Sequence, residues 1–407
     1  MITELVEIGF DLTANNSGPF LPLDHPVAGR LDDADWTLGG EIFYDVTDRV
    51  RSWSSNRGKS RALDAFNAGN ASIVLDNNTR DFDPTYAASP FYGQIIPKRQ
   101  IRISSNGVVQ FYGLIDDWNL DYAPQGDSTA GVVCSDGFAQ LANQTLTGAT
   151  ATSQLSGARV NAILDSADVN WPSDKRAVDS GEVLLGADVI PDNGNALTYL
   201  QLVEASEGGR LFISKAGNLV FKDQNGVQPD GSSIVTFADD GSGVKYTGMQ
   251  VVYGSELLYN QAVVSRVGGS TTTANDTDSQ QAYGIYTITK TDLLMASDAD
   301  VDALAVSLVK QYSEPEFRFE ALTVDLNQIT GPQQTAVLGL EIGDVALIKF
   351  TPNNISPAIE KYVEVLGVAQ SSDPNRRTVT LNFGTLDYIS FILDDVAFGK
   401  LDSATLG

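Results

Sequence analysis

Turn-forming residues interrupt this chain at short intervals, and the segments between them alternate apolar and polar side chains. In QIRIS (100–104), Ile101 and Ile103 fall on one side, as in a strand with one buried face. Runs such as DNNTRDFDP and SSNG supply the turns. The sequence therefore predicts a mainly β protein. Further strands are expected at 71–77, 108–118, 129–136, 249–254, 260–268, 283–289, 317–326, 345–350, 362–370 and 377–383.

Helical spacing replaces this alternation between residues 148 and 240. The run SGARVNAILDSADV (156–169) predicts a helix with Ser156 as its N-cap. NALTYLQLVEASEGG (195–209) predicts a second helix, which Asn195 caps and Gly208 ends. Residues 210–223 then have the pattern of a tight hairpin. This region therefore predicts a small helix-and-hairpin module.

Beyond this module, one further helix is predicted over 299–312, with Ser297 or Asp298 as its N-cap. The segment GGSTTTANDTDSQQ (268–281) lacks the apolar side chains of a core element. It is therefore expected to form a mobile loop.

Two distant parts of the chain share a three-strand pattern. PKRQIRI, FYGLI and AGVVCSD follow one another in the first part, and IGDVALIKF, YVEVLGV and RTVTLNFG in the last. We interpret them as two related β domains separated by an α/β insert. The expected organisation is an extended N-terminal arm at 1–40, a first β domain at 41–147, the insert at 148–240, a second β domain with one helix at 241–392 and a C-terminal arm at 393–407.

Charge limits the classes of partner. Acidic residues outnumber basic ones 52 to 26, which gives a formal charge of −26. Such a surface repels nucleic-acid phosphates and anionic membranes, so neither specific nucleic-acid binding nor membrane insertion is expected. The same charge would suit a channel through which DNA passes without adhering. The N-terminus lacks the features of a signal peptide, so synthesis and folding are expected in a cytoplasm.

No local motif predicts catalysis, a cofactor or a metal. P-loop, GxGxxG, CxxC, GxSxG and HExxH patterns are absent, and Cys134 is the single cysteine, expected to be buried. His25, the single histidine, is expected to lie in a turn.

Asp76–Asp83 has the alternating oxygens of a calcium loop but lacks its Gly and final Glu, so an Asx-closed turn is favoured over calcium. Asp298, Asp300 and Asp302 are interpreted as helix capping. Glu41, Asp45 and Asp48 could pair as acid and base, but among 52 acidic residues such pairing has little specificity.

A ten-residue phrase occurs near both ends of the chain. LDHPVAGRLD (23–32) and LDDVAFGKLD (393–402) both read L-D, four residues, G, a basic residue, L-D. The glycines allow a bend with positive φ, and the leucines can anchor in apolar pockets. We interpret the two copies as latches that tie β domains together. The candidate latch residues are Leu23, Asp24, Gly29, Leu31, Leu393, Asp394, Gly399 and Leu401.

The order of phrases across the chain resembles a known family. YDVTDRVRSWSSNRGKSRALDAFNAGNASIVLDNNTRDFDP is followed by SPFYGQIIPKRQIRIS, FYGLIDDWNLDY and SDGFAQLA, then by LTYLQLVEASEGGRLFISKAGNLVFKD, EPEFRFEALTVDL and LGLEIGDVALIKF. Together they resemble the minor tail proteins of tailed bacteriophages of the siphophage type, and within them the tail-tip or baseplate hub proteins.

This resemblance implies two tail-tube-like β-barrel domains plus a small helix-hairpin module and extended terminal arms. It implies a homotrimeric hub at the distal tail tip of a virion, adapting a sixfold tail tube to threefold tip components. The implied partners are the tail tube or distal tail protein, the tape-measure protein, and tail fibre or spike proteins. The chain lacks the additional wall-cleaving or receptor-binding regions of larger tail-tip proteins, so it is expected not to be an enzyme.

Three alternatives remain open from the sequence. A distal tail ring protein would be a hexameric adaptor. A carbohydrate-binding β protein for host attachment would use aromatics such as Trp53 and Trp118, if these are exposed. A wall hydrolase would require specific catalytic carboxylates.

Overall fold

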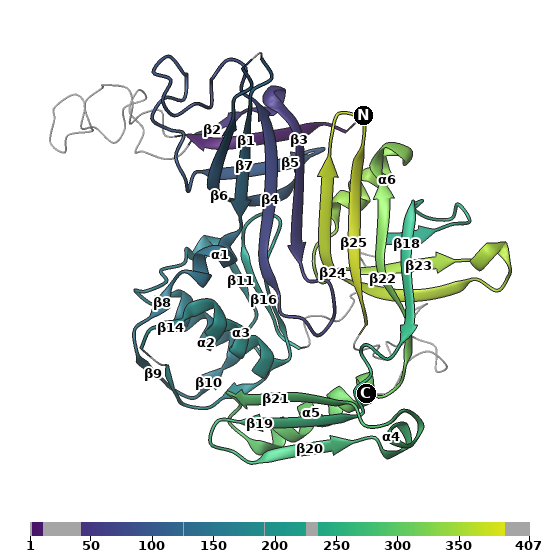
Figure 1. Cartoon of the computed structure of the whole chain (residues 1–407). Coiled ribbons are helices and arrows are strands. Elements are labelled where there is room, and N and C mark those ends of the chain that lie inside the picture. The colour runs from purple at the N-terminus through teal and green to yellow at the C-terminus, as the bar shows by residue number, and fades with distance from the viewer. Residues whose placement is uncertain (1, 11–41, 125, 191, 225–234, 387–407) are drawn as a thin grey trace.

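The structure is a computed structural model that describes residues 2–10, 42–124, 126–190, 192–224 and 235–386. Its largest element is a 13-stranded sheet that runs through both β parts of the chain (Figure 1). In sheet order its main path is β18 (Gly248–Gly254), β22 (Glu316–Asp325), β25 (Arg377–Thr385), β24 (Ile359–Ser372), β3 (Val50–Gly58), β4 (Asn67–Asp76), β7 (Thr129–Ser135), β6 (Val108–Asp121), β5 (Gln100–Ser105), β1 (Glu4–Phe10) and β2 (Ile42–Asp45). Off this path, β23 (Val345–Phe350) joins β24 to β17 (Val235–Ala238). The mainly β prediction is confirmed.

Two halves of this sheet share one strand order. The first β half has the order β3-β4-β7-β6-β5-β1, and the second β half has β18-β22-β25-β24-β23-β17. The six strands also follow the same order along the chain in each half. β6 and β24 are each 14 residues long, and each bulges against its neighbour, at Asp116 and at Leu366. One difference is that β1 pairs antiparallel with β5 whereas β17 pairs parallel with β23. The two halves therefore repeat one strand order, and the described strand pairings close neither half into a barrel.

Each β half has its own hydrophobic core. The first contains Ile8, Ile73, Ile103 and Phe111, all fully buried. The second contains Leu322, Ile348, Val365 and Leu381, which are also fully buried. These side chains come from alternate positions of their strands, so the period-two pattern in the sequence identifies the buried face.

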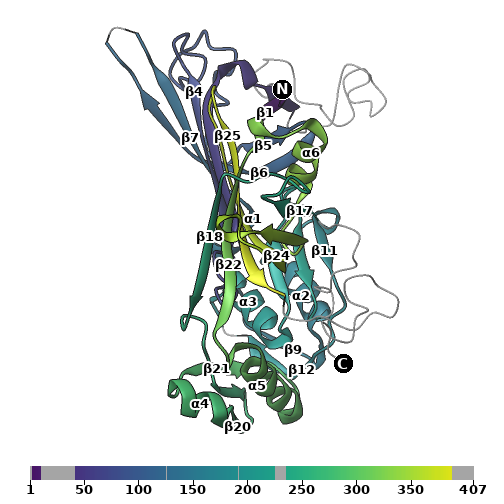
Figure 2. The same cartoon turned by 90° about the vertical axis from the view of Figure 1, so that its right-hand side faces the viewer.

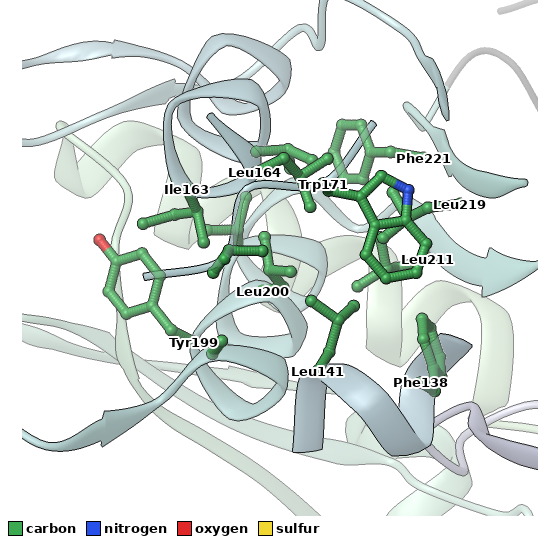
Figure 3. Close-up of a cluster of buried hydrophobic side chains, with 14 of the residues drawn as sticks. Phe138, Leu141, Ile163, Leu164, Trp171, Tyr199, Leu200, Leu211, Leu219 and Phe221 are labelled. Atoms are coloured by element: carbon green, nitrogen blue, oxygen red, sulfur yellow. The ribbon is translucent and has the colours of Figure 1, made fainter. Parts of the chain in front are cut away.

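Residues 137–224, which include most of the insert expected at 148–240, pack below the first half (Figure 1). Its helices are α1 (Gly137–Ala142), α2 (Ser156–Leu164) and α3 (Ala196–Glu207). Figure 3 shows their apolar faces meeting β15 (Arg210–Ile213) and β16 (Leu219–Lys222) around Leu200, Leu211 and Trp171. Its short strands are β8 (Thr145–Leu146), β9 (Ala149–Ala151), β10 (Gln154–Leu155), β11 (Arg176–Val178), β12 (Leu184–Leu185), β13 (Asp188–Ile190) and β14 (Gly194–Asn195).

The capping predictions in the insert are mostly confirmed. Asn195 caps α3 by accepting a hydrogen bond from the Thr198 amide, and Gly208 ends the helix at φ +72°. The hairpin prediction is also confirmed, since β15 and β16 pair antiparallel. Ser156 is not an N-cap: it is the first residue of α2, and its hydroxyl donates instead to Glu207.

A smaller module lies at the opposite end of the sheet from β1 and β2. It contains α4 (Thr277–Tyr283), α5 (Asp298–Tyr312) and a sheet of β20 (Thr271–Asn275), β19 (Gln261–Arg266) and β21 (Thr287–Leu293). Ser297 caps α5, as predicted. The loop prediction for 268–281 is wrong, because β20 pairs with β19 and Asp276 caps α4. Pairing with β19 orders this polar segment, and the small side chain of Ala274 packs against the core of the module.

The structure also has a helix that the sequence pattern did not predict, α6 (Gly331–Gly339). Residues 241–386 therefore contain three α-helices rather than the single one expected for 241–392. The sequence signal for this helix is a capping box, in which the side chain of each of Thr330 and Gln333 accepts a hydrogen bond from the backbone amide of the other. A proline also lies in the first turn.

Candidate assembly interface

The two β halves join through direct strand pairing. β24 pairs antiparallel with β3, from Gly367 opposite Gly58 to Ser372 opposite Trp53. A β-carbon at Gly58 would overlap the Leu366 carbonyl oxygen, and its φ is +91°. Glycine is therefore required where the two backbones approach. The halves form one continuous sheet rather than two domains on a linker.

A buried polar network crosses the same junction. Arg377, with 3% of its side chain exposed, donates from Nε to Glu4 at 2.9 Å and from Nη2 to Ser105 at 3.1 Å and to Gln370 at 2.5 Å. Its guanidinium also lies 4.1 Å from the centre of the Trp53 ring. Burial lowers the pKa of Arg377, against the opposing effect of Glu4. Because these partners come from both halves, the network fixes their relative position.

The insert is fastened to the junction by a second charged cluster. Arg57 of β3 lies 2.8 Å from Glu341, which also accepts a hydrogen bond from the Lys215 amide. Burial alone would raise the pKa of Glu341, but the charge of Arg57 and backbone donors hold it below its usual value. The Lys215 ammonium donates to carbonyls at the end of α6, including Leu338 at 3.0 Å. These contacts join both halves and the insert into one body.

Among the described strands of the main sheet, β2, β17 and β18 each pair with one other strand, and β6 is paired on both sides over only part of its length. β18 pairs with β22 alone, and its exposed residues include Gln250 and Tyr253. In β6, the N-terminal part pairs with β5 up to Leu114, but no described strand pairs with that side of Asp117–Asp121. Figure 2 shows β18 at a margin of the sheet and the β6–β7 hairpin projecting beyond the other strands. Open strand edges are the places where another chain can add a strand.

The predicted latch residues belong to the two terminal segments of the chain. Leu23, Asp24, Gly29, Leu31, Leu393, Asp394, Gly399 and Leu401 all lie outside the described residues. His25 and Glu41 do as well. The latch interpretation therefore stays a proposal.

The Asp76–Asp83 segment is a turn closed by its own side chains, as favoured from the sequence. Asp76 accepts from the Asn78 amide at 2.9 Å, and Asp83 accepts from the Thr85 amide at 2.8 Å. The hydroxyl of Thr85 and the Arg80 guanidinium hold the pKa of Asp83 well below its usual range. Within the described part of the chain, no group of three or more His, Cys, Asp or Glu side chains could hold a metal ion.

The remaining acidic candidates have structural contacts. Asp45 accepts a hydrogen bond from the Thr47 amide, which begins a short 3-10 turn that includes Asp48. Asp298 and Asp300 lie in the first turn of α5, which Ser297 caps, and Asp298 also forms an ion pair with Arg266 at 2.6 Å. Asp302 lies beyond the first turn and accepts a hydrogen bond from the Thr272 hydroxyl. Cys134 is buried, and burial raises the pKa of its thiol. None of the described helices is long and apolar enough to cross a membrane.

The aromatic residues considered for sugar binding are not an exposed platform. Trp53 is 3% exposed and lies under Arg377, and Trp118 stacks on Phe82 with centroids 6.1 Å apart. The indole of Trp118 donates to the Ile96 carbonyl at 3.1 Å. The expectation that these two rings are exposed is wrong, because both pack beside the core of the first half.

Comparison with known proteins identifies the fold. No protein-family model matches the sequence, and no curated protein matches it. The 43 kDa tail protein of prophage MuSo2 from Shewanella oneidensis is similar in structure, with TM-score 0.59, 12% identity and coverage of 95% of this chain and 99% of that chain. A tail protein from Neisseria meningitidis MC58 gives TM-score 0.59 and 10% identity over 94% and 96%. A chain of the Francisella PdpA–VgrG complex gives TM-score 0.50 and 8% identity over 94% and 52%. The chain therefore has the fold of phage tail proteins.

Proposed function

We propose that this chain is a structural component of a phage-type tail, and that it acts as the hub at the tail tip. The observation that carries this proposal is the fold shared with two tail proteins, one of them from a prophage, over nearly the full length of each. The repeated topology of the two β halves adds to it. Three copies, each with two equivalent halves, can form a ring that presents six similar units to a tail tube and threefold symmetry to the tip.

In this role the chain binds other tail components and performs no catalysis. Its partners are the tail tube or distal tail protein on one side and fibre or spike proteins on the other, with the tape-measure protein inside the tube. The charge of −26 suits a lumen through which DNA slides without adhering. The terminal arms serve as latches that add contacts between β domains. The protein then resides in the virion after assembly in the host cytoplasm.

Analytical ultracentrifugation of the purified full chain tests this proposal. A trimer of the 43.5 kDa chain, about 130 kDa, is the expected species at micromolar concentration. A hexamer, about 260 kDa, would favour the distal tail ring instead and would overturn the hub assignment. A chain that ends at Tyr388 should retain its circular dichroism and dissociate at higher concentration than the full chain. If it assembles equally well, the latch proposal is wrong.

A further inference from the structure

The junction between the two halves provides a template for a contact between copies. In β24, residues up to Glu364 pair with β23, and residues from Gly367 onward pair with β3. In β6, residues up to Leu114 pair with β5, and no described strand pairs with that side of the corresponding stretch after the bulge, Asp117–Asp121. β6 is therefore a copy of β24 that lacks the second neighbour.

The missing neighbour of β6 corresponds to β18. β3 lies beside β4 at the margin of the first half, and β18 lies beside β22 at the same place in the second half. Both strands end in glycine, Gly58 and Gly254, opposite the start of the next strand in the repeat. β3 uses its outer side to pair with β24, whereas no described strand covers the outer side of β18.

The two open edges cannot satisfy each other within one chain. Six strands, β22, β25, β24, β3, β4 and β7, separate β18 from β6 in the sheet. Backbone groups on an open edge favour addition of a strand from another molecule. The side chains of Asp117, Asn119 and Asp121 on β6, and of Gln250 and Tyr253 on β18, are exposed beside these edges.

We propose that the distal part of β6, Asp117–Asp121, pairs antiparallel with β18 of a neighbouring copy of this chain. The contact repeats between copies the β24–β3 pairing that each copy contains, so it continues the sheet around a ring. It is a head-to-tail contact, which closes only when the rotation between copies completes a circle. This inference rests on the ring of the proposed function and assigns its subunit interface.

The internal junction also fixes the register. Ser371 of β24 lies opposite Ser54 of β3, and Gly367 lies opposite Gly58. Transferred through the two bulges, this places Asp121 opposite Gln250 of the neighbour and Asp117 opposite Gly254 of the neighbour.

Cysteine cross-linking of the full chain tests the pairing and its register. Asp121→Cys with Gln250→Cys should form a disulfide between copies under mild oxidation, because opposed residues of an antiparallel pair meet the distance requirement. The matched control, Asp121→Cys with Tyr253→Cys, lies out of register and should cross-link about tenfold less. Cys134 is buried and does not compete. All substituted side chains are exposed, so both double variants should fold.

The expected result is a ladder of cross-linked species on a non-reducing gel that ends at the mass of the closed ring. Mixing the two single variants, Asp121→Cys and Gln250→Cys, should give cross-linked dimers, because the contact is head-to-tail. A trimer by ultracentrifugation that gives no in-register cross-link, or equal cross-linking of both pairs, would overturn this interface and leave the hub proposal standing. A chain that remains monomeric would overturn both.

Discussion

Replacing Arg377 with methionine should separate the contribution of the buried junction from that of ordinary surface charge. Arg377 is the centre of the network that joins Glu4, Ser105 and Gln370, and its side chain is 3% exposed. Methionine keeps most of the volume but leaves the carboxylate of Glu4 without its buried partner. Removing one member of a buried charge pair costs about 3–5 kcal/mol.

The expected shift in melting temperature follows from the size of the chain. An unfolding entropy of about 2.1 cal/mol/K per residue over 407 residues gives roughly 0.85 kcal/mol/K. Arg377→Met should therefore lower Tm by about 4–6 °C in calorimetry or differential scanning fluorimetry. Amide hydrogens of β3 and β24 should also exchange faster, because the pairing they share is weakened.

The neighbouring arginine supplies the control. Arg376 is 60% exposed and lies 3.7 Å from Asp325, so Arg376→Met should change Tm by no more than about 1 °C. Adding Glu4→Gln to Arg377→Met should cost less than the sum of the two single changes, since they remove the same interaction. Equal Tm values for the two arginine variants, or strictly additive effects in the cycle, would refute the assignment of the junction to this network.

Two other perturbations have signs set by the structure. Gly58→Ala should lower the free energy of unfolding by about 1–3 kcal/mol or more, because the added β-carbon would meet the Leu366 carbonyl at the β3–β24 pairing. Gly241 also has a positive φ, +86°, but open space around it, so Gly241→Ala should lower Tm less. Similar losses in Tm for the two variants would contradict the close approach of the backbones at Gly58. Burial raises the pKa of Glu204 to about 7, so its contribution to stability is present at low pH and is lost as pH rises through that value. Between pH 5 and 8 the wild-type Tm should therefore fall more than the Tm of Glu204→Gln. If the two proteins lose Tm equally with rising pH, the raised pKa of Glu204 is disproved.

Local sequence determined the elements of this protein to a large extent. The alternation around Ile101 and Ile103 predicted a buried strand face. The residues that cap α3 and α5 could be predicted because capping depends on neighbours a few positions away. The shared three-strand pattern was legible for the same reason, and the structure shows both copies as antiparallel meanders. Local patterns did not predict β20, which is ordered by pairing with another strand. They also did not predict α6, whose N-terminal signal is a capping box.

The junction between the two β halves depends on contacts that no local pattern encodes. Arg377 and Glu4 are separated by nearly the whole chain, and only the fold brings them to 2.9 Å. From the sequence, Trp53 was expected to be exposed, but tertiary packing buries its ring beneath Arg377. The sequence by itself determined which segments are strands and that they recur. Only the tertiary structure decided which strand edges pair and which stay open, because pairing partners are set by packing of the whole sheet rather than by side-chain period.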